Sequence, residues 1–314
     1  MSNIVNTIGV VSGVFTIITF FKDGIFGGPP DPAGATVRIK AGVPELLNEG
    51  DSLGGSIDKI YAFGTDNKYL GQSDGCDIGT GGLCTRTVDQ TSPGKHSRYI
   101  SVSNNADATC ISWISVLQHD GLNNGAWSGD IGYGCGQAWY NSIERAGEKS
   151  DGSAYIPKCT WLDADYTNGI ANAALKFDVF AYSNLVGDTI NSNAACASTI
   201  FDSTTGPIPG IPGGRIANRP LWMTEQLIIS NFTSQTADQL CNSAKSWGPD
   251  FIGPDGKFCD MSSKTLAPLC AMEDIDGCVE MDEGEGTLKK RMNVARRSTS
   301  AVHKSYKKID KWGQ

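Results

Sequence analysis

The sequence predicts a mainly β protein. We expect a disulfide-bonded antiparallel β-sandwich or jelly-roll-like body, with an apolar N-terminal helix and a small, cysteine-rich C-terminal α/β appendix. Glycine accounts for 38 of 314 residues, which suits many tight turns between short strands because the usual share is only ~7 %. All ten cysteines lie between Cys76 and Cys278, and an even number of cysteines is typical of a disulfide framework. Several segments alternate apolar and polar residues, as in a sheet with one buried face.

Residues 1–28 are predicted to form the apolar helix. Residues 1–21 contain no charged side chain, and their larger apolar residues recur at helical spacing. Gly9 and Gly13 allow another helix to approach closely, so the helix can pack or assemble through Gly9, Gly13, Phe15 and Ile18. An atypical secretion signal or membrane anchor in residues 1–21 stays an alternative. The segment lacks the basic start of a signal peptide, and polar residues dilute its apolar run.

Residues 36–205 are expected to form the β-rich body. A hairpin is predicted around Gly64–Asn67, where turn-forming residues separate two strand-like runs. The segment 174–182 alternates most regularly, which indicates a strand with one face in the core. The strand candidates are residues 36–40, 60–63, 69–70, 98–102, 110–117 and 174–182.

Residues 206–230 form a linker rich in proline and glycine at its start, and such a run holds neither a helix nor a central strand. The appendix covers residues 231–278. It contains a predicted helix over 234–247, capped by Thr233 or Ser234 and ended by Gly248-Pro249. A hairpin over 251–259 is expected around the turn Pro254-Asp255-Gly256.

Residues 279–314 form a tail that is first acidic and then basic. Residues 287–314 contain nine Lys or Arg and one acid, Asp310. The formal charge of this part is therefore +8 and that of the remaining 286 residues is −16, which together give the net charge of −8. We expect a solvated, disordered tail. The alternative is an arm that binds another copy of the chain, a polyanion or an anionic membrane. The acidic body argues against nucleic acid as a partner.

The cysteines allow many pairings. Short loops favour Cys76–Cys84, Cys241–Cys259 and Cys270–Cys278, which leaves four cysteines to connect the sheets in an open pairing: Cys110, Cys135, Cys159 and Cys196. No Cys-x-x-Cys pair occurs and the chain has three histidines, His96, His119 and His303, so no Cys/His zinc site is expected. Oxidised thiols predict an extracellular or cell-surface location. The glycosylation sequon at Asn231 agrees with it.

One segment matches the first block of the Gly-Asp-Ser-Leu hydrolases: Gly50-Asp51-Ser52-Leu53-Gly54. A serine nucleophile needs a histidine base oriented by a carboxylate. Those hydrolases take both from an Asp-x-x-His block, which this sequence lacks. We therefore interpret the segment as a glycine-rich turn and keep a Ser52-dependent esterase as an alternative.

Aromatic residues in glycine-rich surroundings are candidates for stacking on sugars, namely Trp127, Trp139 and Tyr140, although core packing is the more usual role of such rings. Asp163 and Asp165 would share one face of a strand. They could contact a glycan, act as a glycosidase pair or bind Ca²⁺, although a solvated pair in a turn is the more usual explanation of such a spacing. Asp120 with Asp130 is a second carboxylate pair of this kind. We expect no cofactor, with Ca²⁺ as the sole candidate ion.

Three segments of the sequence are similar to segments of a known protein family. They are residues 1–10, the block from Cys110 to Tyr140 with its Trp127-Ser128-Gly129-Asp130, and the block 246–270 with its Ser246-Trp247-Gly248-Pro249. They resemble a family of uncharacterised cysteine-rich proteins of filamentous ascomycete fungi. The resemblance implies a fungal source and export, and it assigns no catalytic residue.

Three function hypotheses follow. The first is a non-enzymatic extracellular or cell-surface protein that is structural and self-associating, a homo-oligomer held by the N-terminal helix and the basic tail. The second is a lectin-like module that binds carbohydrates such as cell-wall glycans. The third is the Ser52-dependent hydrolase.

Overall fold

The structure is a computed structural model of the chain. It describes residues 34–44, 53–148, 152–166, 169–183, 185, 188–189, 192–204, 219, 221–243, 246–294 and 297–313. The predicted N-terminal helix with Gly9, Gly13, Phe15 and Ile18 lies outside these residues, as do Ser52 and most of the proline-rich linker. The chain divides into two compact units, unit 1 within Met1–Val43 and Ser52–Ala217, and unit 2 within Pro44–Asp51 and Asn218–Gln314.

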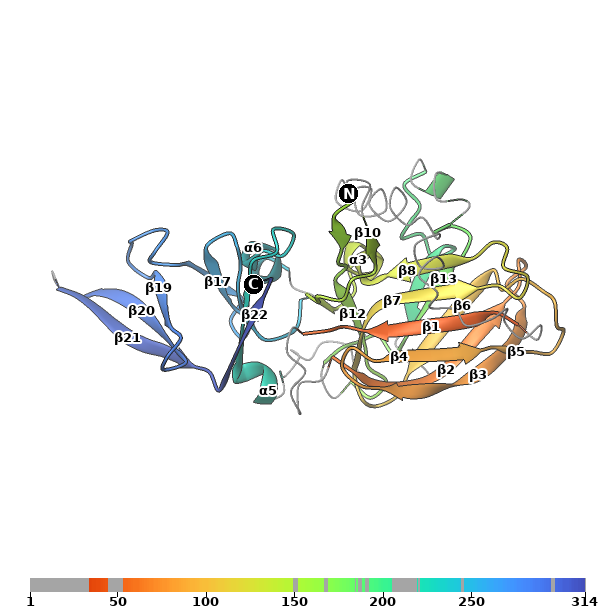
Figure 1. The fold of residues 1–314 in the computed structure, drawn as a ribbon, viewed down its shortest axis with the longest axis horizontal. Coiled ribbons are helices and arrows are strands. Elements are labelled where there is room, and N and C mark those ends of the chain that lie inside the picture. Colours follow the sequence, from red (N-terminus) through yellow and green to blue (C-terminus); the bar gives the residue numbers. More distant parts are fainter. Residues whose placement is uncertain are drawn as a thin grey trace. The chain divides into compact units, whose positions relative to one another are not determined.

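The described residues of unit 1 form two six-stranded antiparallel sheets, which we call sheet A and sheet B, and a two-stranded one (Figure 1). Sheet A has the order β4-β1-β7-β12-β9, with β8 also paired to β7. Its strands are β1 (Thr36–Ala41), β4 (Leu83–Thr87), β7 (Thr109–Leu117), β8 (Gly125–Ser128), β9 (Trp139–Tyr140) and β12 (Cys159–Leu162). Sheet B has the order β14-β13-β6-β2-β3-β5. Its strands are β2 (Gly55–Phe63), β3 (Tyr69–Ile78), β5 (Asp89–Gln90), β6 (Tyr99–Asn104), β13 (Ala174–Asp178) and β14 (Phe201–Thr204).

The core of unit 1 lies between the inward faces of these sheets. Alternate residues of β1 and β2, such as Ile39 and Ile60, belong to one buried apolar cluster, as period-two side chains require. The indole of Trp127 stacks on Phe201 with ring centroids 6.0 Å apart. The short elements α3 (Gly129–Gly134), β10 (Gly147–Glu148) and β11 (Ala154–Tyr155) complete the unit. The prediction of a mainly β, sandwich-like body is confirmed.

The disulfides confirm the three short-loop pairs, Cys76–Cys84, Cys241–Cys259 and Cys270–Cys278. The remaining four cysteines form Cys110–Cys159, which joins β7 to β12 within sheet A, and Cys135–Cys196. The bridge that connects the two sheets is Cys76–Cys84, because Cys76 lies in β3 of sheet B and Cys84 in β4 of sheet A. Each bridge contributes about 2–4 kcal/mol by restricting the unfolded chain. Five disulfides indicate an oxidising environment.

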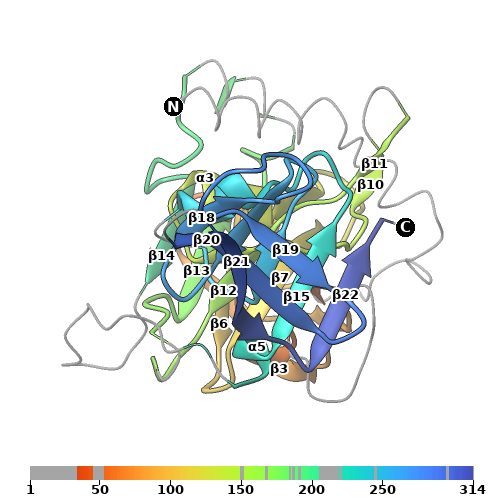
Figure 2. The same cartoon turned by 90° about the vertical axis from the view of Figure 1, so that its left-hand side faces the viewer.

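Unit 2 contains a five-stranded and a three-stranded sheet (Figure 2). The larger sheet has the order β18-β17-β16-β15-β22, and β15 pairs in parallel with both β16 and β22. Its strands are β15 (Gln226–Ser230), β16 (Asp250–Ile252), β17 (Lys257–Asp260), β18 (Thr265–Pro268) and β22 (Lys308–Trp312). The smaller sheet consists of β19 (Val279–Asp282), β20 (Thr287–Val294) and β21 (Arg297–Ser305). The described helices of the unit are α5 (Leu221–Thr224) and α6 (Ala237–Cys241).

The predicted hairpin over residues 251–259 is present as β16 and β17, but the helix before it is shorter than predicted. Helix α6 begins after Thr236, whose Oγ1 accepts a hydrogen bond from the Gln239 N–H at 3.2 Å. It ends at Cys241, with Asn242 as the C-cap. Thr236 is therefore the N-cap in place of Thr233 or Ser234.

The basic tail is not the disordered segment expected from its charge. The described part of this segment forms β20, β21 and β22, and several of its basic side chains pair with acids of the same unit. Lys289 contacts Asp282 at 3.0 Å and Lys311 contacts Glu283 at 2.6 Å. Much of the charge excess of the tail is therefore compensated inside unit 2. In the part of the chain that the structure describes, no helix has the length and apolarity needed to cross a membrane.

Candidate functional site

The aromatic residues predicted to bind glycans lie in the core. Trp127, Trp139 and Tyr140 are fully buried, and the ring of Trp139 packs edge-on against Tyr133 with centroids 4.6 Å apart. A buried ring presents no face to a sugar in solution, so these three residues stabilise the fold as the structure places them.

The predicted carboxylate pairs have structural roles. Asp163 is fully buried, and its Oδ1 accepts a hydrogen bond from the Asp165 N–H at 3.4 Å, which closes a turn. Asp130 lies at the start of α3 and accepts hydrogen bonds from the Tyr155 hydroxyl at 2.7 Å and the Lys158 N–H at 3.1 Å. Its predicted partner Asp120 contacts His96. Asn231 is exposed just after β15, so its glycosylation stays a prediction.

The outer face of sheet B carries aromatic side chains that sequence reasoning missed. In β2, Ile60 and Ala62 face the core, whereas Tyr61 and Phe63 face outward and are partly exposed. Phe63 is paired with Tyr69 of β3 on one side and with Tyr99 of β6 on the other. Three rings on three neighbouring strands therefore form one row, and Tyr69 keeps 50 % of its surface exposed.

A second row lies beside the first on the same outer face. Tyr61 is paired with Gln72 of β3 and with Ser101 of β6, and Ser101 is paired with Lys176 of β13. The residues of this row are at least partly exposed. We call the surface formed by Tyr61, Phe63, Tyr69 and Tyr99 the aromatic face.

Polar groups are held in place on the aromatic face. The Lys176 ammonium lies 3.6 Å from the ring centroid of Phe63 and donates a hydrogen bond to Asn67 Oδ1 at 2.6 Å. Its partial burial lowers the pKa of Lys176, because desolvation disfavours the charged form. The Tyr69 hydroxyl donates to Gln72 Oε1 at 3.1 Å. Rings with hydrogen-bonding groups beside them suit a ligand that has both apolar faces and hydroxyl groups.

The outer face of sheet A is buried at its centre, unlike the outer face of sheet B. The pair Arg38 and Ser115 on β1 and β7 is buried, as is Trp113 opposite Lys40. The indole N–H of Trp113 donates to Glu144 Oε1 at 3.3 Å. The centre of sheet A is therefore covered, and sheet B presents the more accessible aromatic surface of unit 1.

A cluster of metal-ligand type lies in two loops of unit 1. His96 precedes β6, and His119 and Asp120 follow β7. One ligand atom from each side chain lies within 4.8 Å of the others. The sequence does not reveal this convergence, because residues 96 and 119 come together only when β6 and β7 lie in facing sheets.

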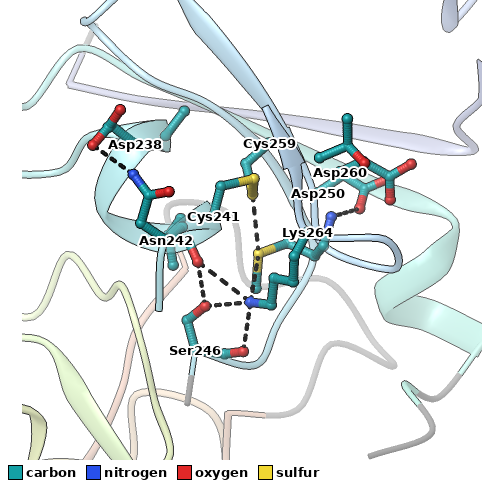
Figure 3. Close-up of a disulfide and its surroundings, with 12 residues drawn as sticks. Asp238, Cys241, Asn242, Ser246, Asp250, Cys259, Asp260 and Lys264 are labelled. Carbon is teal, nitrogen blue, oxygen red and sulfur yellow. Dashed lines mark hydrogen bonds between the residues drawn. A yellow bond between two sulfur atoms is a disulfide. The ribbon is translucent and has the colours of Figure 1, made fainter. Parts of the chain in front are cut away.

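In unit 2, a serine and a lysine lie beside the Cys241–Cys259 disulfide (Figure 3). The Lys264 ammonium donates to Ser246 Oγ, to the Ser246 carbonyl at 2.8 Å and to the Leu240 carbonyl at 3.3 Å. Burial lowers the pKa of Lys264 to about 8, and a lysine of low pKa can activate a serine.

The surroundings of Ser246 argue against a nucleophile. Ser246 is 5 % exposed, and its hydroxyl donates to the Leu240 carbonyl at 2.6 Å. The lysine and the serine together satisfy a carbonyl at the end of α6, which lacks a partner within the helix. We therefore assign this pair a structural role.

No family model, curated protein or solved structure matches this chain. The functional argument consequently depends on its own residues, and the resemblance to fungal secreted proteins stays a prediction.

Proposed function

We propose that this protein is an extracellular carbohydrate-binding protein and that the aromatic face of sheet B is its binding surface. The observation that carries the proposal is the row of Tyr69, Phe63 and Tyr99 on three neighbouring strands, on a face open to solvent. The five disulfides support an oxidising compartment. Such a compartment is where cell-surface and cell-wall glycans are encountered.

The dimensions and chemistry of the face suit an oligosaccharide. Neighbouring strands lie about 4.8 Å apart, so a row across three strands has the length for more than one sugar ring. The apolar C–H faces of sugars pack against aromatic rings, while Gln72, Ser101 and Lys176 offer donors and acceptors for the hydroxyl groups. A glycan lying across the strands would contact both rows.

Two acids beside the face are engaged by cations. Asp178 contacts Arg98 through both carboxylate oxygens, at 2.8 Å from the guanidinium Nε, and Asp74 is paired with Lys59. Glycoside hydrolysis needs two carboxyl groups that reach the scissile bond, one of them protonated. A carboxylate engaged by a cationic partner does not suit the role of the protonated acid, which favours binding without hydrolysis at these two positions.

The proposal is tested with the full chain on a glycan array and in pull-down assays with insoluble chitin, β-1,3-glucan and mannan. We expect binding that Tyr69→Ala and Tyr61→Ala each weaken about fivefold to tenfold, because an aromatic contact contributes ~1 kcal/mol and 1.4 kcal/mol is a tenfold change. Leu83→Ala is the matched control, since Leu83 is an apolar side chain of sheet A that is 44 % exposed.

Two outcomes would contradict the proposal. One is a wild-type chain that binds no glycan on the array or in the pull-down assays. The other is a pair of tyrosine variants that retain wild-type affinity while their thermal unfolding is also unchanged. If Leu83→Ala weakened glycan binding as much as the tyrosine variants do, the binding would not depend on the aromatic face.

The structural, self-associating hypothesis stays a prediction. It depends on the helix predicted for residues 1–28, which lies outside the described residues, and on a free basic tail. The internal pairing of the tail, for example Lys304 with Asp250 at 2.7 Å, leaves fewer cationic groups for contacts between copies.

A further inference from the structure

The loop cluster in unit 1 has the donor set of a transition-metal site. His96 and His119 provide imidazole nitrogens and Asp120 provides a carboxylate, all within 4.8 Å of one another. The His96 Nε2 and Asp120 Oδ2 atoms are 2.8 Å apart, and the two imidazole centroids are 5.3 Å apart. Two histidines with one carboxylate form a typical three-ligand protein set for zinc, with the fourth position left to water or another ligand.

The two loops are fastened to each other beside the ligands. The fully buried side chain of Gln118 binds the main chain of Ser97 twice: its Oε1 accepts from the Ser97 N–H and its Nε2 donates to the Ser97 carbonyl, both at 2.9 Å. Gln118 adjoins His119, and Ser97 adjoins His96. The clamp therefore fixes the distance between the two histidine-bearing segments before any ligand binds, which reduces the entropy cost of binding.

The loop after β7 is held by its own polar side chains. Asn124 Oδ1 accepts a hydrogen bond from the Gln118 N–H at 2.8 Å, and its Nδ2 donates to the Gly121 carbonyl at 2.7 Å. Asp120 Oδ1 accepts from the Leu122 N–H at 2.9 Å. This last bond orients the carboxylate, so that Oδ2 is the oxygen that faces His96.

The neighbours of the imidazoles complete the arrangement. The Asn123 side-chain amide lies 3.2 Å from His96 Nδ1, and such a contact orients a histidine that binds metal through its other nitrogen. In the structure the amide nitrogen faces Nδ1 and donates to it. With metal on Nε2, Nδ1 carries the proton, and rotation of the Asn123 amide by half a turn brings its oxygen into position to accept it. Among the residues that the structure describes, none forms a hydrogen bond with the buried His119 Nδ1. A buried polar atom without a partner is costly in a protein interior, which indicates a site completed by a further group.

We propose that His96, His119 and Asp120 bind a divalent first-row transition metal ion, with Zn²⁺ as its representative. Imidazole donors favour zinc, copper, nickel and cobalt over Ca²⁺, which prefers oxygen ligands only. The side chains of His96 and Asp120 are 27 % and 34 % exposed, so an ion can enter from solvent. The site is separate from the aromatic face and does not depend on glycan binding.

The test uses tag-free, full-length protein treated with a chelator and then titrated with ZnCl₂ in a calorimeter. We expect one equivalent of Zn²⁺ to bind. His119→Ala and Asp120→Asn should each weaken binding more than about 100-fold, because even a residue that only orients a ligand accounts for about 10–100-fold. Substitution with Co²⁺ gives an independent readout, since the bound ion should show visible absorption that both variants lose.

Two further variants sharpen the test. His303→Ala is the matched control, because the chain has three histidines and His303 belongs to unit 2; it should bind as the wild type does. Asn123→Gly should weaken binding about tenfold without straining the backbone, because residue 123 has a φ of 55°, which glycine adopts freely.

The proposal is overturned if the wild-type protein shows neither heat of binding nor a cobalt spectrum. It is equally overturned if Asp120→Asn binds as tightly as the wild type. Should His119→Ala fail to fold, Asp120→Asn and Asn123→Gly decide the question, since Asp120 lies in an exposed loop.

Discussion

The two units fill their interiors in different ways. Unit 1 packs side chains of two six-stranded sheets into one apolar cluster that includes Trp127 and Phe177. Unit 2 has a smaller apolar cluster, which includes Leu227 and Phe258, and it also surrounds a buried carboxylate with cations. Asp250 accepts hydrogen bonds from Arg219 at 2.9 Å and from Lys304 at 2.7 Å. The Tyr306 hydroxyl and the Met261 N–H, each at 2.9 Å, complete its coordination.

The difference shows how a smaller unit can hold its strands together. A small unit buries a smaller fraction of its surface than a large one. Unit 2 adds two disulfides and an ionic network that joins β16 to β21 and to Arg219. A buried network of this kind does not make the unit more stable than apolar packing would. It does make each charged partner necessary for stability, because removing one leaves a buried charge without its counter-charge.

The largest effect is expected in the apolar interior of unit 1. Trp127→Ala removes a fully buried indole that stacks on Phe201, and such truncations cost about 3–5 kcal/mol. Hydrogen exchange read by mass spectrometry should show lost protection in peptides of unit 1 and little change in unit 2. Leu122→Ala is the control, because that side chain is 63 % exposed. Equal loss in both units would show that their interiors unfold as one cooperative system.

The ionic interior is tested by Asp250→Asn. The amide keeps part of the hydrogen bonding but removes the charge that compensates Arg219 and Lys304, so unit 2 should lose about 3 kcal/mol. Glu283→Ala breaks the exposed pair with Lys311 in the same unit and should cost less than about 1 kcal/mol. Denaturant unfolding followed by the same exchange peptides compares the two variants. If both variants lost the same free energy of unfolding, burial of Asp250 would not raise the cost of breaking an ion pair.

The smallest effect concerns pH and Lys264. Its pKa in the folded protein is about 8, against an ordinary value of 10.5. Between these values the unfolded chain binds a proton that the folded protein does not, so the contribution of Lys264 to stability rises with pH. Unfolding of wild type and Lys264→Met should be compared between pH 7.5 and 9.5. The stability of the wild type relative to Lys264→Met should rise with pH across this range, and a pH-independent difference would contradict the lowered pKa.

Local signals predicted a large part of the fold. The hairpin of β2 and β3 follows from the turn residues around Gly64–Asn67, and the short disulfide loops follow from cysteine spacing. These features depend on neighbours in the sequence, which is the information that propensity and spacing contain.

Features that depend on distant partners were not predictable. The sequence of β20–β22 is so basic that it predicts a disordered tail. The structure shows why it is ordered, because its lysines lie beside acids that are distant in the sequence: Lys289 beside Asp282, Lys304 beside Asp250, and Lys311 beside Glu283. The aromatic face contains no tryptophan, whereas the sugar-stacking prediction depended on Trp127 and Trp139, which are buried. The outward positions of Tyr61 and Phe63 could have been assigned from their alternation with Ile60 and Ala62.

The parallel pairing of β15 with β22 has a consequence for biogenesis. Gln226 and Asp310, which meet across this pair, are 84 positions apart, and long-range parallel contacts form slowly. All described strands of unit 1 precede β15 in the sequence and are synthesised before it, so the larger unit can begin to form its disulfides before unit 2 is complete. Unit 2 has to wait for Trp312, and until then β15 exposes an unpaired edge that a chaperone or a neighbouring nascent chain could occupy.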